Sequence, residues 1–198
     1  MELLSLDACR NVVKEAVSKG NSLTLAQELS IDHKADVFKM LESSFEEKAH
    51  LCNAIMDDPE YRAKVLELFR QRLPLDEMKV GPDTTLGLGN KYWKETALEY
   101  LMQELRNFPL EGQDFIETGL QCAPVRTRHG ALNVLQAWIS AKGIPLSQLL
   151  PDFQKLLMRL SEVEIKDEIK ERMERLIAEN ISFEDNLGDN DDDGQGRE

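Results

Sequence analysis

The chain has 198 residues, of which 41% are hydrophobic and 31% are charged, and its formal net charge is −13 at pH 7. This length is enough to bury a hydrophobic core without disulfides or a metal, so we assign the protein no cofactor. Binding to a phosphate backbone needs clustered lysines and arginines, and the acidic balance of the chain therefore argues against direct nucleic-acid binding.

Cysteine usage and hydropathy together indicate a cytoplasmic location. Cys9, Cys52 and Cys122 are odd in number, far apart and outside any CxxC spacing, which is typical of reduced thiols. No run approaches the ~18 apolar residues that a membrane-spanning helix needs. The N-terminus lacks the basic and then apolar order of a secretory signal. We therefore expect a cytoplasmic protein with no membrane partner.

Residues 1–73 are predicted to form an irregular N-terminal helical bundle. Helical spacing of apolar residues predicts its first three helices, over 5–18, 22–29 and 32–55. The segment Asp57-Asp58-Pro59-Glu60 predicts the start of a fourth helix, because Asp can cap an N-terminus and proline is favoured in the first turn. This helix should end near Arg72. Its apolar stripe consists of Tyr61, Val65, Leu68 and Phe69.

Residues 74–90 are predicted to form a long loop. Prolines and glycines interrupt any helix in this segment, at Pro74, Gly81, Pro82, Gly87 and Gly89. The favoured interpretation is a connector between two helical subdomains. The alternative is a binding element or lid, because long loops on rigid scaffolds often carry function.

The segment 91–180 is predicted to be regularly helical. Its five expected helices cover 91–106, 110–122, 125–141, 147–160 and 162–179. Short connections between such helices force antiparallel neighbours. Similar short motifs return at offsets of 34 to 40 residues, which is the range of helical-repeat proteins. Residues 181–198 are rich in Asp, Asn, Gly and Glu, a composition that predicts a disordered acidic tail.

The segment 109–178 resembles HEAT repeats, which belong to the armadillo-like helical repeats. A HEAT-like first helix is suggested by Leu149-Leu150-Pro151 with Leu156-Leu157, and the second helix of that repeat by Glu162 and Ile165-Lys166. Pro124-Val125-Arg126 resembles the second helix of the preceding repeat. The resemblance implies an all-α fold in which antiparallel helical pairs stack as a short α-solenoid. It also implies that the protein binds other proteins.

Four basic residues and two aromatic residues are the candidate partner-binding side chains. In a HEAT-like stack, the second helices line the concave face and would present Arg126, Arg128, Lys166 and Lys170 as a basic strip for an acidic peptide. The favoured interpretation of these four is nevertheless inter-helix ion pairing or solvation, because exposed charges are ordinary. Tyr92 and Trp93 follow the glycine-rich loop, and a binding hot spot is expected there first. Trp138 continues a helical apolar stripe and is expected in the core.

The sequence thus predicts a non-enzymatic adaptor or scaffold for another protein or a charged peptide segment. His33, His50 and His129 belong to no metal-ligand motif, and a nucleophilic pair of Cys122 with His129 has little support. One alternative is an acidic regulator whose tail competes for a basic nucleic-acid-binding surface on a partner. The other is a helical enzyme with a site near residues 81–93.

Overall fold

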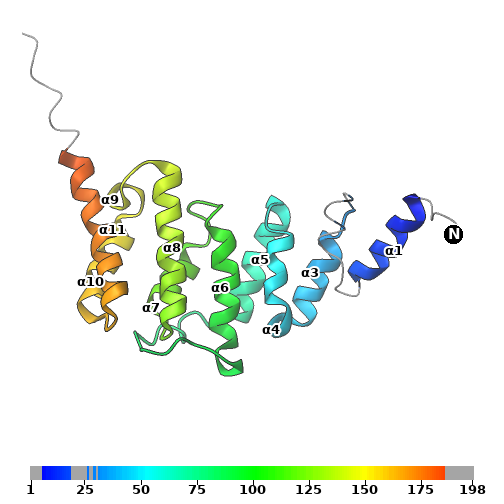
Figure 1. The fold of residues 1–198 in the computed structure, drawn as a ribbon, viewed down its shortest axis with the longest axis horizontal. Coiled ribbons are helices and arrows are strands. Elements are labelled where there is room, and N and C mark those ends of the chain that lie inside the picture. Colours follow the sequence, from blue (N-terminus) through cyan, green and yellow to red (C-terminus); the bar gives the residue numbers. More distant parts are fainter. Residues whose placement is uncertain (1–5, 19–25, 27–28, 30, 186–198) are drawn as a thin grey trace, which may run out of the picture.

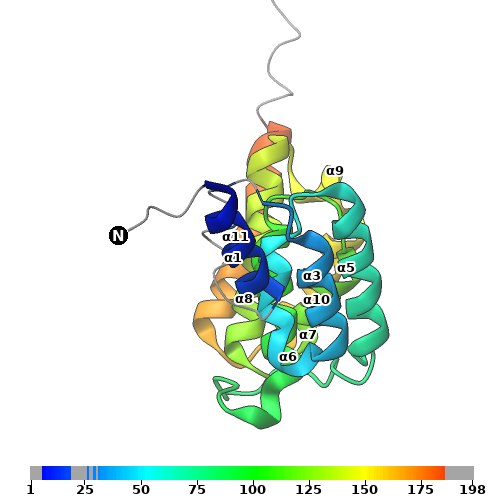
Figure 2. The same cartoon turned by 90° about the vertical axis from the view of Figure 1, so that its right-hand side faces the viewer.

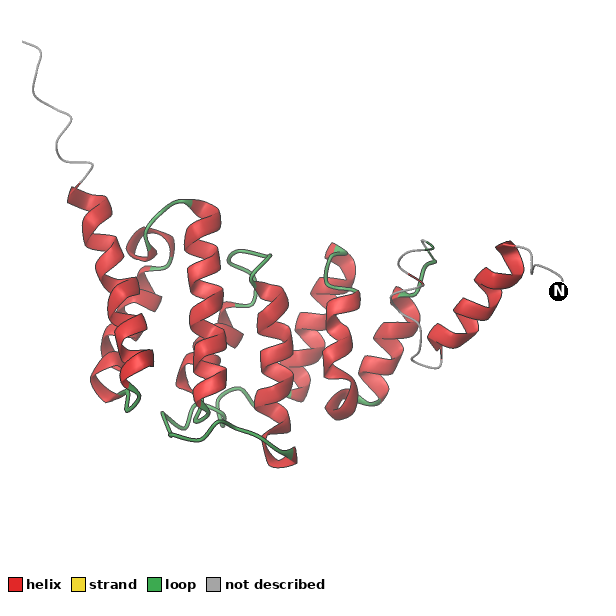
Figure 3. Cartoon of the chain, viewed as in Figure 1, coloured by secondary structure: helices red, strands yellow, loops and turns green. Residues whose placement is uncertain are grey.

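The computed structural model describes residues 6–18, 26, 29 and 31–185, and within this part the chain is helical and has no strand (Figure 3). The ten α-helices of these described ranges are α1 (Leu6–Ser18), α3 (Lys34–Ser43), α4 (Phe45–Lys48), α5 (Pro59–Arg72), α6 (Trp93–Leu105), α7 (Gln113–Gln121), α8 (Val125–Lys142), α9 (Leu146–Leu149), α10 (Pro151–Val163) and α11 (Asp167–Asp185). Two 3-10 helices, η1 (Ala49–Ala54) and η2 (Asn90–Tyr92), complete them. The predicted all-α fold is confirmed. No helix of the described ranges is long and apolar enough to cross a membrane.

The helices follow one another in chain order along the long axis of the molecule, from α1 at one end to α11 at the other (Figure 1). A second view shows two layers (Figure 2). In one layer α8 packs between α6 and α11, and η1 packs on the other side of α6. The second layer contains α5, α7 and α10. This arrangement leaves one long side of α6 and of α8 facing away from the second layer.

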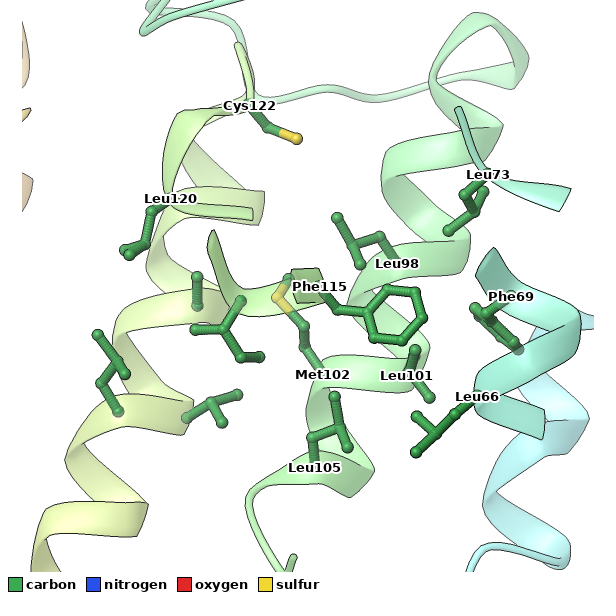
Figure 4. Close-up of a cluster of buried hydrophobic side chains, with 14 of the residues drawn as sticks. Leu66, Phe69, Leu73, Leu98, Leu101, Met102, Leu105, Phe115, Leu120 and Cys122 are labelled. Atoms are coloured by element: carbon green, nitrogen blue, oxygen red, sulfur yellow. The ribbon is translucent and has the colours of Figure 1, made fainter. Parts of the chain in front are cut away.

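A single cluster of buried hydrophobic side chains extends between the layers from Val37 to Leu176. Figure 4 shows part of it, with the ring of Phe115 from α7 lying among the leucines of α6 and facing Phe69 of α5. Trp138 is fully buried, as the sequence predicts, and its Nε1 donates a hydrogen bond to the Leu105 carbonyl at 2.6 Å. Of the described residues, a separate and smaller cluster joins Val13 and Val17 of α1 to Ala26 and Ile31.

The start of α5 confirms the prediction made from Asp57 to Glu60. The side chain of Asp58 is the N-cap and accepts hydrogen bonds from the backbone amides of Glu60 and Tyr61 at 2.9 and 3.3 Å. Pro59 occupies the first helical turn. A backbone N–H at this position would find no acceptor within the helix, so the proline costs no hydrogen bond. The predicted apolar face is buried at Val65, Leu68 and Phe69, with Tyr61 half-buried beside it.

Two helices predicted as continuous are interrupted in the structure. The segment 32–55 breaks at Ser44, whose φ of −140° and ψ of 51° lie outside the helical region, and it becomes α3, α4 and η1. The segment 147–160 breaks at Leu150, because the ring of Pro151 disfavours helical angles in the residue before it. Pro151 therefore begins α10 and leaves α9 as a single turn.

The last helix begins later and ends later than predicted. Helix α10 runs on to Val163, and α11 begins only at Asp167. The side chain of Glu164 explains this boundary, because its Oε1 accepts hydrogen bonds from the amides of Ile165 and Lys166, both at 3.0 Å. Helix α11 also includes residues 181–185, which were assigned to the tail. The rest of the predicted tail, 186–198, and most of the helix predicted over 22–29 lie outside the described residues.

The predicted loop between α5 and α6 runs beneath the turn that joins α7 to α8 and then returns to the start of α6 (Figure 3). Backbone hydrogen bonds tie it there: Gly81 donates to Gln121, Asp83 donates to Ala123, and Thr85 accepts from Val125. Gly87 has a φ of 71°, and a Cβ at this position would lie 2.6 Å from Pro124 Cβ, so only glycine fits. The core continues past the loop, since Phe45 and Trp93 are in edge contact.

Candidate functional site: a groove between α6 and α8

A groove of about 660 Å³ lies along the exposed sides of α6 and α8. Helix α6 contributes Thr96, Glu99, Tyr100 and Gln103, at intervals of one or three residues, and Arg106 follows directly after the helix. Helix α8 contributes a matching line: Val125, Arg126, His129, Gly130 and Asn133. This spacing places each line on one helix face, while the opposite faces enter the core. Leu86 and Leu88 of the loop border one end of the groove.

The floor of the groove is formed where α8 carries a glycine. Gly130 lies in the middle of α8, and a Cβ added there would meet only Cε of Met102, at 3.2 Å. Met102 itself is buried and also packs against Gly119 of α7. The missing side chain at Gly130 therefore adds to the space of the groove.

Glu99 is a largely buried carboxylate at the side of the groove. Arg126 Nε lies 2.6 Å from Glu99 Oε2, and the Thr127 hydroxyl donates to Glu99 Oε1 at 2.7 Å. Burial raises the pKa of Glu99 above its usual value, and the Thr127 hydrogen bond and the charge of Arg126 counteract this rise. Arg126 also donates to the carbonyl of Gly87, at 3.2 Å, so this group anchors the loop to α8.

A second polar group connects α8 to α11. Arg172 donates to His129 Nδ1 and to Asn133 Oδ1, both at 2.7 Å. A guanidinium can only donate, so Nδ1 is the acceptor and the proton of a neutral imidazole resides on Nε2. His129 Nε2 lies 3.7 Å from Glu168 Oε1. Partial burial, followed by the charge of Arg172, lowers the pKa of His129.

Arg128 does not lie on an exposed basic strip, contrary to the prediction. Its side chain is 1% exposed and forms a two-bonded ion pair with Glu164, which is 2% exposed. It also donates to the carbonyls of Cys122, Ala123 and Asp83. The interpretation as an inter-helix ion pair is therefore confirmed for Arg126 with Glu99 of α6, whereas Arg128 pairs with a residue of the turn between α10 and α11.

The two lysines of the predicted strip also lie outside the groove lining. Lys166 precedes α11 instead of lying on it, because the turn held by Glu164 occupies residues 164–166. Lys170 is half-buried on α11. The structure thus brings only Arg126, of the four basic residues, to the groove.

Tyr92 and Trp93 lie next to the groove and not inside it. The Tyr92 hydroxyl is 3.2 Å from Thr85 Oγ1, and this hydrogen bond lowers the pKa of Tyr92. Trp93 is half-buried and lines an adjoining hollow that shares Thr96, Tyr100 and Arg126 with the groove.

The thiols of Cys52 and Cys122 are not activated as nucleophiles. Burial raises the pKa values of Cys52 and Cys122 to about 12, so both remain protonated near neutral pH. Of the nucleophilic pair considered for Cys122 and His129, the thiol is buried with a raised pKa, and Nδ1 of the histidine accepts from Arg172. Within the described ranges, no group of three or more His, Cys, Asp or Glu residues could hold a metal ion.

Comparison with protein-family models, curated proteins and solved structures gave no match to this chain. The resemblance to HEAT repeats therefore stays a prediction. Sequence reasoning missed most residues of the groove, among them Leu86, Leu88, Tyr100 and Asn133. One usable signal was present: Gly130 is an unfavourable residue for the middle of a helix.

Proposed function

We propose that the protein is a non-enzymatic adaptor that binds another protein through the groove between α6 and α8. The apolar border of the groove carries this proposal. Leu88 is 64% exposed, and Leu86 and Tyr100 are also exposed on the same border. Large apolar side chains grouped around a preformed concave site are typical of surfaces that a partner covers.

We further propose that the helices form a short solenoid of the HEAT type. Consecutive helices α7 and α8 pack against each other, as do α10 and α11, and α8 also contacts its neighbours α6 and α11. Each pair then buries its apolar stripe against the next pair, as expected of a repeat scaffold. Such a scaffold holds a binding groove on rigid helices, which suits an adaptor.

The proposal is tested by affinity capture from native cell extract with matched variants. Leu88→Asp places a charge on the groove border, and Val80→Asp places the same charge on a 70% exposed residue of the same loop, outside the groove. We expect the partner to be retained by the intact chain and by Val80→Asp, and to be lost with Leu88→Asp. Circular dichroism of both variants checks that they fold.

A third variant lacking residues 186–198 separates the groove from the acidic tail. Loss of the partner with this truncation, together with full retention by Leu88→Asp, would replace the proposal with the competing role of an acidic regulator. Retention of the same partner by all three variants would show that neither surface binds it.

A further inference from the structure

Most polar side chains that line the groove are already bonded within the chain. Five of them have such partners: Thr96, Glu99, Arg126, His129 and Asn133. The Glu99 carboxylate and the Arg126 guanidinium pair with each other at 2.6 Å. Arg172 of α11 donates to both His129 and Asn133. Each of these five side chains therefore has a hydrogen-bond partner without a ligand.

The charged residues of the lining balance each other. Glu99 and Glu168 are acidic, whereas Arg106 and Arg126 are basic. Glu99 and Arg126 form one pair, and the other two residues are exposed to solvent. An exposed countercharge offsets little of the free energy that a charged ligand loses on leaving water. The surface of a ligand that fills the groove is therefore expected to be uncharged.

The same internal bonding favours a ligand whose backbone needs no partner. An extended peptide carries free N–H and C=O groups, and each of them needs a hydrogen-bond partner when it is buried. The lining offers few such partners, because most of its polar side chains are already bonded. A helix pairs its backbone groups internally and presents side chains to its surroundings. A helical ligand therefore suits this lining better than an extended one.

The two walls of the groove have the shape that a third helix needs. Helices α6 and α8 are packed together, and both begin beside the loop, α6 at Trp93 and α8 at Val125, whose amide donates to Thr85 (Figure 1). They therefore run side by side in the same direction. A groove between two such helices accepts side chains of a third helix at intervals of three or four residues.

Apolar groups cover the part of the lining that such a helix would contact. They are supplied by Leu86, Leu88, Tyr100, Met102 and Val125. Gly130 lies above Met102 and has no side chain, so the floor can receive a large apolar side chain there. Val125 and Asn133 are eight positions apart on α8, or about 12 Å, which is about two turns of a bound helix.

We infer that the groove binds an amphipathic helix of a partner protein, about two turns long at the contact, whose apolar face carries no charged side chain. One large apolar side chain of this helix is seated over Gly130 and Met102, and a second contacts Leu86 and Leu88. This inference rests on the proposed adaptor function and names the kind of segment that the adaptor recognises.

A library of random peptides of about 20 residues, long enough to form a helix, tests the inference by phage display. Selection is run in parallel on the intact chain, on Gly130→Gln, whose new side chain occupies the groove, and on Met158→Gln, an exposed position of α10 in the other layer. We expect peptides enriched on the intact chain and on Met158→Gln, but not on Gly130→Gln. These peptides should share apolar residues three or four positions apart, with no Asp, Glu, Lys or Arg on that face.

Thermal melts establish that both variants are folded before their selections are compared. If Gly130→Gln does not fold, Leu88→Asp replaces it, because this residue lies on the loop and its charge disfavours an apolar ligand.

One enriched peptide is then made synthetically and titrated by fluorescence anisotropy. We expect its Kd to change less than about threefold between low and high salt, because no charged pair that salt could screen contributes to binding. Proline at a solvent-facing position in the middle of the peptide should weaken binding more than about tenfold, since proline breaks a helix. Alanine at the same position should leave the affinity unchanged.

The contradicting outcomes separate this inference from the adaptor function. Charged residues on the shared face, a larger effect of salt, or full binding by the proline peptide would overturn the uncharged helix and leave the adaptor function standing. Enrichment of no peptide on the intact chain would do the same. Recovery of the same peptides from the intact chain and from the folded groove variant would overturn both.

Discussion

Arg128 holds three separate segments together at a single buried point. Its guanidinium contacts the α5–α6 loop, the α7–α8 turn and Glu164 in the turn before α11. Removing one member of such a buried pair leaves the other charge unsatisfied, so Arg128→Met should lower the free energy of unfolding by about 3–5 kcal/mol. Chemical denaturation measures this. Lys155→Met removes an exposed ion pair with Asp152 and is the control that should change little. Equal stability of the two variants would contradict the role given to Arg128.

The lowered pKa of His129 should make the stability of the fold depend on pH, and the contacts of the imidazole determine the direction. Its pKa is lowered from 6.5 by partial burial, next by the charge of Arg172 and less by Arg128, while Glu168 and Glu164 oppose the change. The unfolded chain then binds more protons than the folded one just below pH 6.5, so stability decreases as pH falls from 6.5 toward the folded pKa.

NMR titration of the imidazole should therefore give a pKa below 6.5 for His129. His129→Asn keeps an acceptor for Arg172 and should remove this part of the pH dependence of stability. A pKa for His129 at or above 6.5 would mean that the neutral, Arg172-bonded imidazole is not the state in solution.

At the scale of elements, two glycines on adjacent helices should respond oppositely to alanine. At Gly119 of α7, a Cβ would lie 2.8 Å from Met102 Sδ and 3.1 Å from Ala131 Cβ, so Gly119→Ala should destabilise the fold by about 1–3 kcal/mol. At Gly130 it would meet only the flexible end of Met102, so Gly130→Ala should stabilise α8 by about 0.5–1 kcal/mol. Thermal unfolding of both variants compares them directly. Destabilisation by Gly130→Ala would show that this glycine is needed for packing and not for the groove.

The positions of most helices could be predicted from local sequence signals. The breaks within two predicted helices could not, because each depends on the backbone angles of a single residue. Asp58 with Pro59 fixed the start of α5, and the apolar stripe through Trp138 fixed the buried face of α8. No proline or glycine near Ser44 indicates the break there in the sequence. Pro151 does mark the boundary at Leu150, whereas apolar spacing alone predicts a continuous helix over 147–160.

The groove could not be predicted because its residues meet only through tertiary packing. Thr127 and Glu99 are 28 positions apart, and Arg172 and His129 are 43 apart. Arg128 and Arg126 look alike in the sequence, yet one is buried and the other borders the groove. The difference arises from Glu164, which belongs to a turn that the sequence placed inside a helix.

At the scale of the whole molecule, the two core clusters should have different local stabilities. Among the residues that the structure describes, the cluster at α1 contains four buried side chains, whereas α6 and α8 belong to the continuous main cluster. Regions with few buried apolar contacts open at lower free energy. Native-state hydrogen exchange should therefore be faster for the amides of α1 than for those of α6 and α8. Equal protection would mean that the chain unfolds as one unit.

The central claim, that the α6–α8 groove is the partner-binding surface, is tested most directly by photo-crosslinking inside cells. A benzoyl-phenylalanine replaces Tyr100 in the groove or, in a matched chain, the exposed Met158 on α10 of the other layer. We expect irradiation to give a discrete covalent adduct with another protein from position 100 and none from position 158. Adducts from position 158 alone, or from neither position, would contradict the claim.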